Sequence, residues 1–351
     1  MSSSTNGSGG PAPVNYAGAS IARDAELAAA VTLRIPEGTT FAFVGEGNAN
    51  VVFSFTLPAQ HDANPENLKG KLLRVPKAGR GLSYPELQDY WERTIKPLFE
   101  PGDLIQQELV RLPSNECFGM LNDCLRRYEA KGNRRADFRG DQVEATTIGM
   151  LIDDMTDNGG DSYTFQFKPK WLVQSKSAPD DAVRCRNCAR QALRNAEAGH
   201  PPSEKPFSCP LNYIVTLHPG RGRSDLSHFK ATPRLEDRFV RWLEVNPLLP
   251  RLQGAQLMHD VDRGRDDAKL ALAMTLRDCT CFVRFPERDD MPVVAKLGDL
   301  DRKDITAKAA KWWKMEADLL SKGYYHAKES PRQNTDCVLA PENRVLQDFR
   351  P

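Results

Sequence analysis

The sequence predicts an α+β fold with two lobes: a β-rich first lobe with one packed helix, and a larger second lobe that combines helices with strands. In the first half of the chain, short β-branched and aromatic runs alternate with turn signals, which is typical of paired strands. After about residue 162 helical spacing of apolar residues dominates, and strand-like runs return only near residue 280. A flexible Asp-Asn-Gly-Gly stretch marks the predicted boundary, with a first lobe at 31–157 and a second at 158–351.

The first lobe is predicted to contain a series of strands with one helix among them. The helix covers 83–99, because Ser83 is a suitable N-cap and Pro85 falls in the first turn. A charged, glycine-containing segment at 129–142 is predicted to be a loop or an insertion between the last two strands. The predicted strands of this lobe are 31–35, 41–45, 51–57, 71–77, 104–112 and 145–155.

The second lobe is predicted to begin with an apolar and basic stretch at 162–175 and to end with a helix near 305–325. Apolar residues at helical spacing predict the intervening helices, and β-branched and aromatic runs predict the strands. The predicted helices are 184–198, 234–245 and 266–277, and the predicted strands are 280–285 and 292–301.

Composition limits the classes of function. Basic and acidic residues nearly cancel, 48 against 47, so the chain has no global attraction for nucleic acid and any anion site must be local. No run of eighteen apolar residues occurs, and the first twenty residues lack the features of a signal peptide. The sequence therefore predicts a soluble intracellular protein with a disordered tail at 1–30. Its eight cysteines are too few for a disulfide scaffold of this length, which leaves reduced thiols or a metal site.

A glycine-containing loop joins the predicted strands 41–45 and 51–57. It reads Gly-Glu-Gly-Asn-Ala-Asn-Val-Val from Gly45, so Asn50 takes the third glycine position of a G-x-G-x-x-G-x-V pattern. Positions without side chains let backbone N–H groups approach phosphates closely, and asparagine tolerates left-handed backbone angles. The alternative is a tight turn between paired strands, and the loop alone does not decide between the two.

Basic and acidic side chains stand at the ends of other predicted strands. Arg74 can bind phosphate oxygens through two parallel hydrogen bonds, although a basic residue that ends a strand is usually only solvated. Asp278 and Asp299 lie at the edges of apolar runs, where aspartates often cap turns. Phosphoryl transfer needs one carboxylate near the accepting hydroxyl and another on the Mg²⁺ that bridges the phosphates. The order of these motifs therefore predicts a phosphotransferase site.

The most basic part of the chain is 168–194, which contains seven lysines and arginines but only two acidic residues. If its second half is helical, Arg186, Arg190 and Arg194 share one face, because they lie four residues apart. Such a stripe is either a solvated surface or a site for a ligand with several negative charges. The basic residues are Lys168, Lys170, Lys176, Arg184, Arg186, Arg190 and Arg194.

A metal-binding alternative rests on cysteine and histidine. Cys185 and Cys188 form a C-x-x-C pair, which His200 and Cys209 could complete as a zinc site. A second tight pair is missing, since the two cysteines near residue 280 have the wrong spacing and an apolar setting.

In their order along the chain, these motifs resemble those of the inositol-pentakisphosphate 2-kinases, and of their fungal branch in particular. The resemblance covers most of the chain between residues 41 and 325. Its specific part is the combination of the Lys-Pro-Lys-Trp block with the Arg-Cys-Arg-x-Cys-Ala block. The matching blocks are GEGNANVV at 45–52, LLRV at 72–75, YWERTIKPLF at 90–99, KPKW at 168–171, RCRNCA at 184–189, RDCT at 277–280 and DLDRK at 299–303.

The resemblance implies an enzyme that uses ATP and Mg²⁺ to phosphorylate the 2-hydroxyl of inositol 1,3,4,5,6-pentakisphosphate, giving the hexakisphosphate, phytate. It implies a fold similar to that of protein kinases, with an N-lobe, a hinge and an enlarged C-lobe that holds the inositol phosphate. The glycine loop and Arg74 would then contact the ATP phosphates, and the hinge would meet the adenine. The residues implied for the nucleotide are Gly45, Glu46, Gly47, Asn48, Ala49, Asn50, Arg74, Asp153, Asp154, Met155, Gln166 and Lys168.

For catalysis, the resemblance implies that Asp278 is the base or orienting carboxylate for the accepting hydroxyl. Asp299 would be the Mg²⁺ ligand, and Lys168 would face the nucleotide phosphates. The residues implied for the inositol phosphate are Lys170, Arg186, Arg190, Arg194 and Lys303.

One departure from the family pattern is visible. Gln166 stands where a glutamate is often expected to hold the ribose, so that contact is expected to differ in strength. The His/Cys set with which some plant members bind zinc is not found. We expect a monomer in the nucleus or cytoplasm, with no membrane or nucleic-acid partner. The alternatives are a kinase-like phosphotransferase for another inositol phosphate or a small alcohol, and a non-catalytic zinc module that binds RNA or a phosphoinositide.

Overall fold

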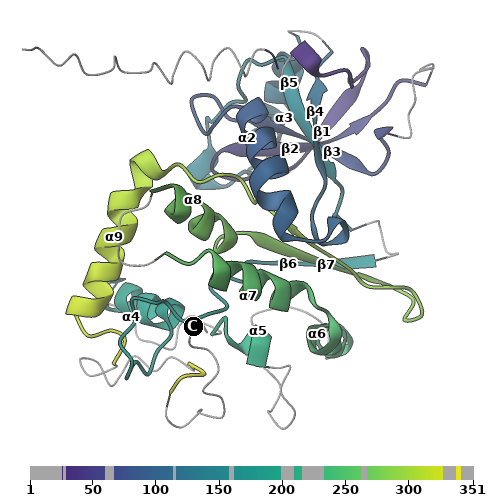
Figure 1. The fold of residues 1–351 in the computed structure, drawn as a ribbon. Coiled ribbons are helices and arrows are strands. Elements are labelled where there is room, and N and C mark those ends of the chain that lie inside the picture. Colours follow the sequence, from purple (N-terminus) through teal and green to yellow (C-terminus); the bar gives the residue numbers. More distant parts are fainter. Residues whose placement is uncertain are drawn as a thin grey trace, which may run out of the picture. The chain divides into compact units, whose positions relative to one another are not determined.

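The computed structural model describes residues 26, 29–59, 67–113, 116–157, 162–198, 209–215, 233–261, 267–326 and 337–340. The chain folds as two compact units (Figure 1). The first consists of Met1–Gln88 with Gln107–Ile152, and the second of Asp89–Gln106 with Asp153–Pro351. Each unit has its own sheet, which agrees with the predicted α+β class.

The first unit is built on a five-stranded sheet with the strand order β1-β2-β3-β5-β4. Strand β2 pairs antiparallel with both β1 and β3, and β4 pairs antiparallel with β5. The register of β1 against β2 shifts between Phe43 and Gly45, so an irregularity lies just before the glycine loop. The strands are β1 (Thr40–Glu46), β2 (Asn50–Thr56), β3 (Lys71–Pro76), β4 (Gln107–Arg111) and β5 (Ile148–Asp153).

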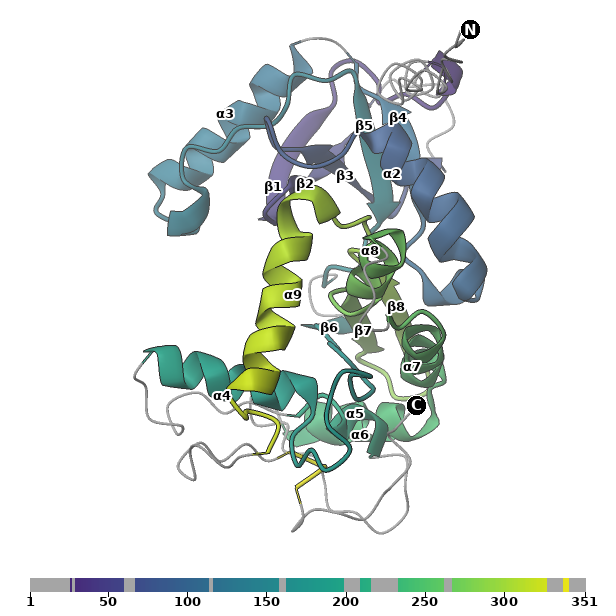
Figure 2. The same ribbon diagram turned by 60° about the vertical axis from the view of Figure 1, so that its left-hand side comes forward.

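Helix α3 (Cys117–Ala130) packs beside β1, as Figure 2 shows. Leu121 and Leu125 of this helix share a core with Val51 and Phe53, which alternate inward on β2. The buried apolar residues of α3 follow one another at spacings of four, three and one, which is the pattern of a helix with one apolar face. Burial of this face anchors the helix on the sheet.

The predicted helical segment 83–99 is confirmed. Its first turn is capped by Ser83, because the backbone N–H of Glu86 donates to Ser83 Oγ at 3.2 Å. The segment changes its winding along its length, from α to π to 3₁₀. Its parts are α2 (Tyr84–Tyr90), a π-helical turn (Trp91–Ile95) and a 3₁₀ turn (Lys96–Leu98), and a second 3₁₀ turn follows at Pro101–Asp103.

Two details of the first unit differ from the sequence prediction. The predicted strand 31–35 contributes only an isolated bridge, between Arg34 and Arg111. The chain between the last two strands contains α3, which the prediction lacks, and then a short 3₁₀ turn, Ala136–Phe138, within the expected loop. Charged residues cover the outer face of α3 and leave only a narrow apolar signal in the sequence.

The second unit contains a three-stranded antiparallel sheet with the order β6-β7-β8. Its register pairs Phe167 with Cys281 and Thr280 with Gly298. The end of β6, the start of β7 and the end of β8 therefore meet at one edge of the sheet. The strands are β6 (Ser162–Phe167), β7 (Thr280–Pro286) and β8 (Val294–Gly298).

Helices complete the second unit. The four predicted helices are present with small shifts of their ends, and α5 and α7 are additional. Phe165, Phe285, Phe239 and Trp242 pack together in the core between the sheet and α6. The helices are α4 (Arg186–Ala198), α5 (Asn212–Val215), α6 (Pro233–Val245), α7 (Leu248–Met258), α8 (Asp267–Leu276) and α9 (Ile305–Ser321).

Within the part of the chain that the structure describes, no helix combines the length and the apolar character that crossing a membrane requires.

Candidate active site

Three charged side chains meet at the edge where the ends of β6, β7 and β8 come together. Lys168 directly follows β6, Asp278 precedes β7 and Asp299 directly follows β8. Lys168 Nζ lies 2.9 Å from Asp299 Oδ2 and 3.4 Å from Asp278 Oδ1, and it donates to the backbone carbonyl of Asp278 at 2.7 Å. Residues far apart in sequence are thus brought together by the register of one small sheet.

Two more lysines surround Asp278. Lys170 Nζ donates to Asp278 Oδ1 at 3.0 Å, and Lys303 Nζ lies 3.5 Å from Asp278 Oδ2. Burial by itself raises the pKa of Asp278, but Lys303, Lys170 and Lys168 outweigh it and lower that pKa to about 2. Asp278 is therefore a carboxylate at neutral pH, inside a positively charged surround.

Two residues of this set have unusual backbone angles. Lys170 has a φ of 62° and Asp299 has a φ of 56°, and among the described residues no other non-glycine residue has a positive φ. Left-handed angles strain a residue with a Cβ atom, and such strain is concentrated at functional sites. The fold holds both side chains in place against this local cost.

Lys168 remains charged at neutral pH. Burial lowers its pKa, but Asp299 and Asp278 together raise it above the usual lysine value. Both carboxylates are about half exposed, at 43% for Asp278 and 45% for Asp299. A ligand can therefore reach all three groups.

The two carboxylates fit the way proteins hold Mg²⁺. This ion is commonly bound by one or two carboxylates together with substrate phosphates and waters, not by a closed cage of protein ligands. Asp278 and Asp299 both approach Lys168, and both are accessible. Their oxygen donors suit the ion, so the residues are compatible with the magnesium role predicted for Asp299.

The arginine stripe of α4 is not uniform. Arg186 is buried, its Nε lies 2.8 Å from Glu316 Oε2, and its guanidinium stands over the Trp171 ring. Its side chain is therefore engaged inside the unit, so the alternative of a solvated surface does not hold for Arg186. Arg190 is half-buried and Arg194 is exposed.

Arg190 is the member of the stripe that belongs electrostatically to the candidate site. Its pKa is lowered to about 10, mainly by burial and then by Arg194 and Arg186, whereas Asp278 acts in the opposite direction. Its Nε is buried and has no hydrogen-bond partner among the described residues. A buried guanidinium N–H of this kind is costly unless an acceptor reaches it. Arg190 is thus suited to bind an anion beside Asp278.

The predicted hinge residues make mainly structural contacts. Asp153 Oδ2 accepts hydrogen bonds from the Gln106 backbone N–H at 3.1 Å and from Lys296 Nζ. Asp154 Oδ1 caps Thr156, and Met155 is buried. Contacts of this segment with an adenine ring remain a prediction. Gln166 is exposed on β6.

In the first unit, the glycine loop is the turn between β1 and β2. The Gly47 backbone N–H donates to the Asn50 carbonyl at 2.9 Å and closes the turn. A Cβ atom at Gly45 or at Gly47 would meet nothing within 4 Å, and neither glycine has a positive φ. The glycines are therefore not required by the backbone angles, and they leave open space above the loop.

The reason expected for Asn50 is wrong. This residue does not have the left-handed backbone angles that asparagine tolerates, because it lies in β2 with ordinary strand angles. Instead, Asn50 Oδ1 accepts a hydrogen bond from the hydroxyl of Tyr84 at 2.9 Å. The guanidinium of Arg74 also stands over the Tyr84 ring, 5.6 Å from its centroid. Tyr84, which the sequence did not single out, therefore links the loop with Arg74.

A buried ionic network holds the base of the glycine loop. Glu46 accepts two hydrogen bonds from Arg134, at 2.8 and 2.9 Å, and its Oε2 lies 2.8 Å from Lys77 Nζ. The side chains of Glu46, Lys77 and Arg134 are exposed by only 4%, 1% and 2%. Glu46 was predicted to contact the nucleotide, but its carboxylate is occupied within the protein. Lys77 and Arg134 carry no motif of their own, so the sequence did not reveal them.

Four buried cysteines form a separate cluster in the second unit. Cys185, Cys188 and Cys209 of the proposed zinc alternative lie together, and Cys337 completes the group. His200 lies outside the described residues. Cys337 follows Cys209 by 128 positions, so the spacing of the sequence gave no sign of it.

Comparisons with known proteins agree with one another. A family model described as inositol-pentakisphosphate 2-kinase matches residues 43–229 and 216–318. Three curated yeast proteins with that name are also similar. The one from Yarrowia lipolytica is 27% identical over 315 residues, which cover 84% of this chain and 93% of that protein. The one from Kluyveromyces lactis is 30% identical over 166 residues, which cover 46% of this chain and 51% of that protein. The one from Debaryomyces hansenii is 23% identical over 305 residues, which cover 70% of this chain and 76% of that protein.

Proposed function

The chain belongs to the inositol-pentakisphosphate 2-kinase family, and from this premise we propose that it transfers the γ-phosphate of ATP to the 2-hydroxyl of inositol 1,3,4,5,6-pentakisphosphate. The product is inositol hexakisphosphate. The observation that carries the proposal is the cluster of Lys168, Asp278 and Asp299 at one sheet edge, with Lys170 and Lys303 beside it. Phosphoryl transfer asks a protein mainly for positioning and charge neutralisation, and this cluster provides both.

Asp278 orients the accepting hydroxyl. A carboxylate with a pKa of about 2 is a weak base, so it is poorly suited to remove a proton early in the reaction. In a loose transition state the hydroxyl needs little activation before the phosphoryl group has left ATP. Asp278 therefore accepts a hydrogen bond from the 2-hydroxyl and takes its proton late, when the new oxygen–phosphorus bond has formed.

Asp299 and Lys168 serve the transferring phosphate. Bound Mg²⁺ neutralises negative charge on the phosphate oxygens, and Asp299 is the carboxylate that holds it. Lys168 Nζ, now 2.9 Å from Asp299, donates to a phosphate oxygen of the nucleotide. Lys168 and Asp299 then exchange each other for the phosphate and Mg²⁺, so each charged side chain still has a partner of opposite charge.

Lys170, Lys303 and Arg190 bind phosphates of the inositol. A pentakisphosphate carries several negative charges, and a dense group of lysines and arginines is needed to replace its hydration. Lys170 and Lys303 now approach Asp278 at 3.0 and 3.5 Å, and the phosphates compete with Asp278 for them. Substrate binding thereby frees the Asp278 carboxylate for the 2-hydroxyl.

ATP lies against the glycine loop, with Arg74 as a further cationic contact and the segment Asp153 to Met155 near the adenine. The open space above Gly45 and Gly47 supports this assignment, because backbone N–H groups reach phosphates only where no Cβ intervenes.

The test is direct. Purified protein with ATP, Mg²⁺ and the pentakisphosphate should give the hexakisphosphate, which phosphorus NMR identifies by the new resonance of the 2-phosphate. A variant with Asp278→Asn should be inactive, while Asp290→Asn, an exposed change elsewhere in the second unit, should remain active. Failure of the unmodified protein to form hexakisphosphate would contradict the proposal. If another inositol phosphate or a small alcohol were turned over better, that compound would take the place of the pentakisphosphate as the proposed substrate.

A further inference from the structure

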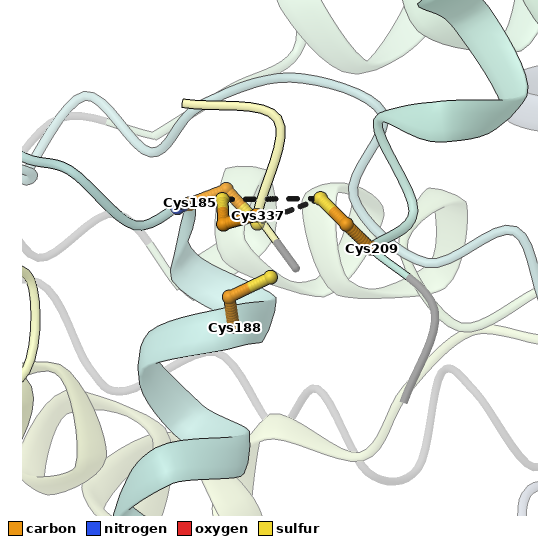
Figure 3. Close-up of side chains that lie close together, drawn as sticks. All are labelled: Cys185, Cys188, Cys209 and Cys337. Carbon is orange, nitrogen blue, oxygen red and sulfur yellow. Dashed lines mark hydrogen bonds between the residues drawn. The ribbon is translucent and has the colours of Figure 1, made fainter. Parts of the chain in front are cut away.

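Four cysteines converge in the second unit from three separate stretches of chain. Cys185 and Cys188 lie one turn apart at the start of α4, while Cys209 and Cys337 come from two other segments, and the side chains point toward a common space (Figure 3). Each is at most 1% exposed, and their sulfur atoms all lie within 4.8 Å of one another. The other four cysteines are also buried but do not join such a group within the described chain.

The spacing of the sulfurs has the dimensions of a metal site. Cys185 Sγ lies 3.7 Å from Cys209 Sγ, which lies 3.9 Å from Cys337 Sγ. Four sulfurs placed tetrahedrally about a zinc ion, with a zinc–sulfur bond of about 2.3 Å, are about 3.8 Å apart. A disulfide would require about 2.05 Å between sulfurs. The four thiols thus leave room for one ion at their centre.

Several groups beside the cluster are placed to stabilise sulfur that is bound to a metal ion. The Cys185 backbone N–H donates to Cys337 Sγ at 3.1 Å, and such N–H groups stabilise metal-bound sulfur. Cys185 accepts the first hydrogen bond of α4 through its carbonyl, from Ala189 at 2.9 Å, so it stands at the positive end of the helix dipole. Arg184 is buried next to it, within electrostatic reach of Cys188 and Cys337. A zinc ion with four thiolates has a net charge of −2, which these groups offset.

We propose that Cys185, Cys188, Cys209 and Cys337 bind one structural Zn²⁺ ion. Binding converts four thiols into thiolates and releases their protons to solvent, with no change of oxidation state. The complete burial of the four ligands leaves no open position for water or substrate, which is the pattern of a structural and not a catalytic zinc.

Such an ion would connect the start of α4 with a segment 152 positions later in the chain. It would hold Cys185 and Cys188 in the first turn of the helix that also carries Arg190. This role does not depend on the proposed kinase activity, because a structural ion stabilises the fold whatever reaction the fold supports.

The experiment begins with the full chain, purified under reducing conditions without chelators, and its zinc content measured by mass spectrometry of the elements. We expect one zinc per chain in the unmodified protein and in the control Cys281→Ser, which changes an equally buried cysteine of the same unit. Cys188→Ser and Cys337→Ser should lose most of the zinc. Cobalt added to the chelator-treated protein should give the intense visible bands of a tetrahedral thiolate site.

Because the variants could fail to fold, the unmodified protein provides a second measurement. Titration of its thiols with an organomercurial should release one zinc as four thiols react, and the melting temperature should fall after chelation and recover with zinc. The proposal is wrong if the unmodified protein holds no zinc and takes up no cobalt. Disulfides among the four cysteines in the purified reduced protein would also overturn it, and stoichiometric iron in place of zinc would overturn the identity of the ion.

A second, independent observation concerns the glycine loop. Glu46 at the end of β1 is held by two hydrogen bonds from Arg134 and by Lys77, while Arg80 Nη1 binds the Asn48 carbonyl at 3.1 Å and its Oδ1 at 3.2 Å. Asp141 joins the two contacts, since its carboxylate binds Lys77 at 3.1 Å and Arg80 at 2.9 Å. The base and the tip of the loop are thus tied to one network.

We infer that Arg134 is a positioning residue for the nucleotide, because it fixes the glycine loop through Glu46. Two parallel hydrogen bonds from a planar guanidinium define the direction of the carboxylate more strictly than a lysine would. Without Arg134, the buried carboxylate of Glu46 loses two of its hydrogen bonds. The loop must then move to bring Glu46 toward water. This inference rests on the proposed function only in its choice of ATP as the ligand.

The test compares two adjacent arginines. Arg134→Met should raise the KM for ATP by about tenfold, the scale of a lost buried charged hydrogen bond, with the KM for the inositol phosphate unchanged. Arg135→Met, which removes an exposed arginine, should change neither constant. Arg134→Lys should restore part of the ATP affinity.

A folded Arg134→Met protein with an unchanged KM for ATP would disprove the positioning role. If the unmodified protein did not phosphorylate the pentakisphosphate, the proposed function would fail, and the affinity for a fluorescent ATP analogue would still test Arg134. An equal rise in both KM values would indicate a general structural effect and would also contradict the inference.

Discussion

Lys168 and Asp299 form an ion pair, with Nζ 2.9 Å from Oδ2, across 131 positions of the chain. The lysine side chain is 36% exposed and the aspartate 45%, so water screens the pair. Ion pairs in such open positions contribute little to stability. The two groups can therefore separate at low cost, the lysine toward a phosphate and the carboxylate toward Mg²⁺, which is what phosphoryl transfer requires of them.

Replacing Asp299 with asparagine should separate turnover from substrate binding. The amide keeps the shape of the side chain but lacks the charge that holds Mg²⁺, so turnover should fall by about a thousandfold or more, the scale of losing a metal or charge interaction in the transition state. Affinity for the inositol phosphate should stay within about twofold, because that ligand meets other residues. Calorimetry and steady-state kinetics give the two quantities, and loss of binding with preserved turnover would reverse the assigned roles.

Lys170→Ala should have the opposite effect. Loss of a charge-assisted hydrogen bond to phosphate should weaken binding of the inositol phosphate by about tenfold to a hundredfold. Lys176→Ala, an exposed change in the same basic segment, serves as the control and should bind normally. Isothermal titration calorimetry measures both, and equal affinities for the two variants would exclude Lys170 from the substrate site.

The arginines of α4 should differ in importance. Arg190 has a buried Nε without a partner among the described residues, whereas Arg194 is exposed. Arg190→Ala should therefore weaken pentakisphosphate binding by about tenfold or more, and Arg194→Ala by much less. The dissociation constants of the two variants for the pentakisphosphate, measured at one fixed salt concentration, test this prediction. A larger loss of affinity in Arg194→Ala than in Arg190→Ala would show that the exposed end of the stripe binds the ligand.

Stability should depend on pH through Asp278. Although burial raises its pKa, Lys303, Lys170 and Lys168 lower it to about 2 in the folded protein. The unfolded value is about 3.9, so the ionised carboxylate stabilises the folded state above about pH 4, and this contribution is lost as the pH falls toward 2. The melting temperatures of the unmodified protein and Asp278→Asn should therefore differ more at about pH 6 than at about pH 3.

Scanning calorimetry at constant ionic strength measures this difference. Asp137→Asn, a change at an exposed aspartate of the first unit, controls for the general effect of removing a carboxylate. A gap between the unmodified protein and Asp278→Asn that stays constant over the pH range would contradict the predicted coupling.

Asn50 should contribute to stability through Tyr84. The hydrogen bond between Tyr84 and Asn50 Oδ1 is 2.9 Å long, and Asn50→Gly removes it while adding backbone freedom in the unfolded chain. The free energy of unfolding should fall by about 1–2 kcal/mol, and by about 1 kcal/mol in Tyr84→Phe. Chemical denaturation of both single variants and of the double variant tests this; strictly additive losses would mean that the hydrogen bond contributes nothing.

Most of the strands and helices that position the candidate site follow from local patterns. The helical segment 83–99, the strands around the glycine loop and the strands beside Asp278 and Asp299 carry clear periodicity or capping signals. The short bridge at Arg34 is an exception, because β-like composition cannot reveal whether a partner strand is free to pair along its length.

Contacts between distant segments are what the sequence could not supply. The bond of Arg134 to Glu46 spans 88 positions, and Cys337 reaches Cys209 across 128. Neither residue has a neighbour in sequence that marks it, because burial and pairing depend on the packed fold. Arg186 is a second example. Helical spacing predicted that it lies on the arginine stripe, but contacts with Glu316 and Trp171, which are distant in sequence, hold its side chain inside the unit.

The register of β6, β7 and β8 has a consequence for how the chain can be altered. Lys168, Asp278 and Asp299 owe their proximity to pairings such as Phe167 with Cys281 and Thr280 with Gly298, and not to the length of chain between them. Peptide inserted between β6 and β7, or a circular permutant opened there, should keep the three groups together as long as the strands still pair. Relatives of quite different length could share this site for the same reason.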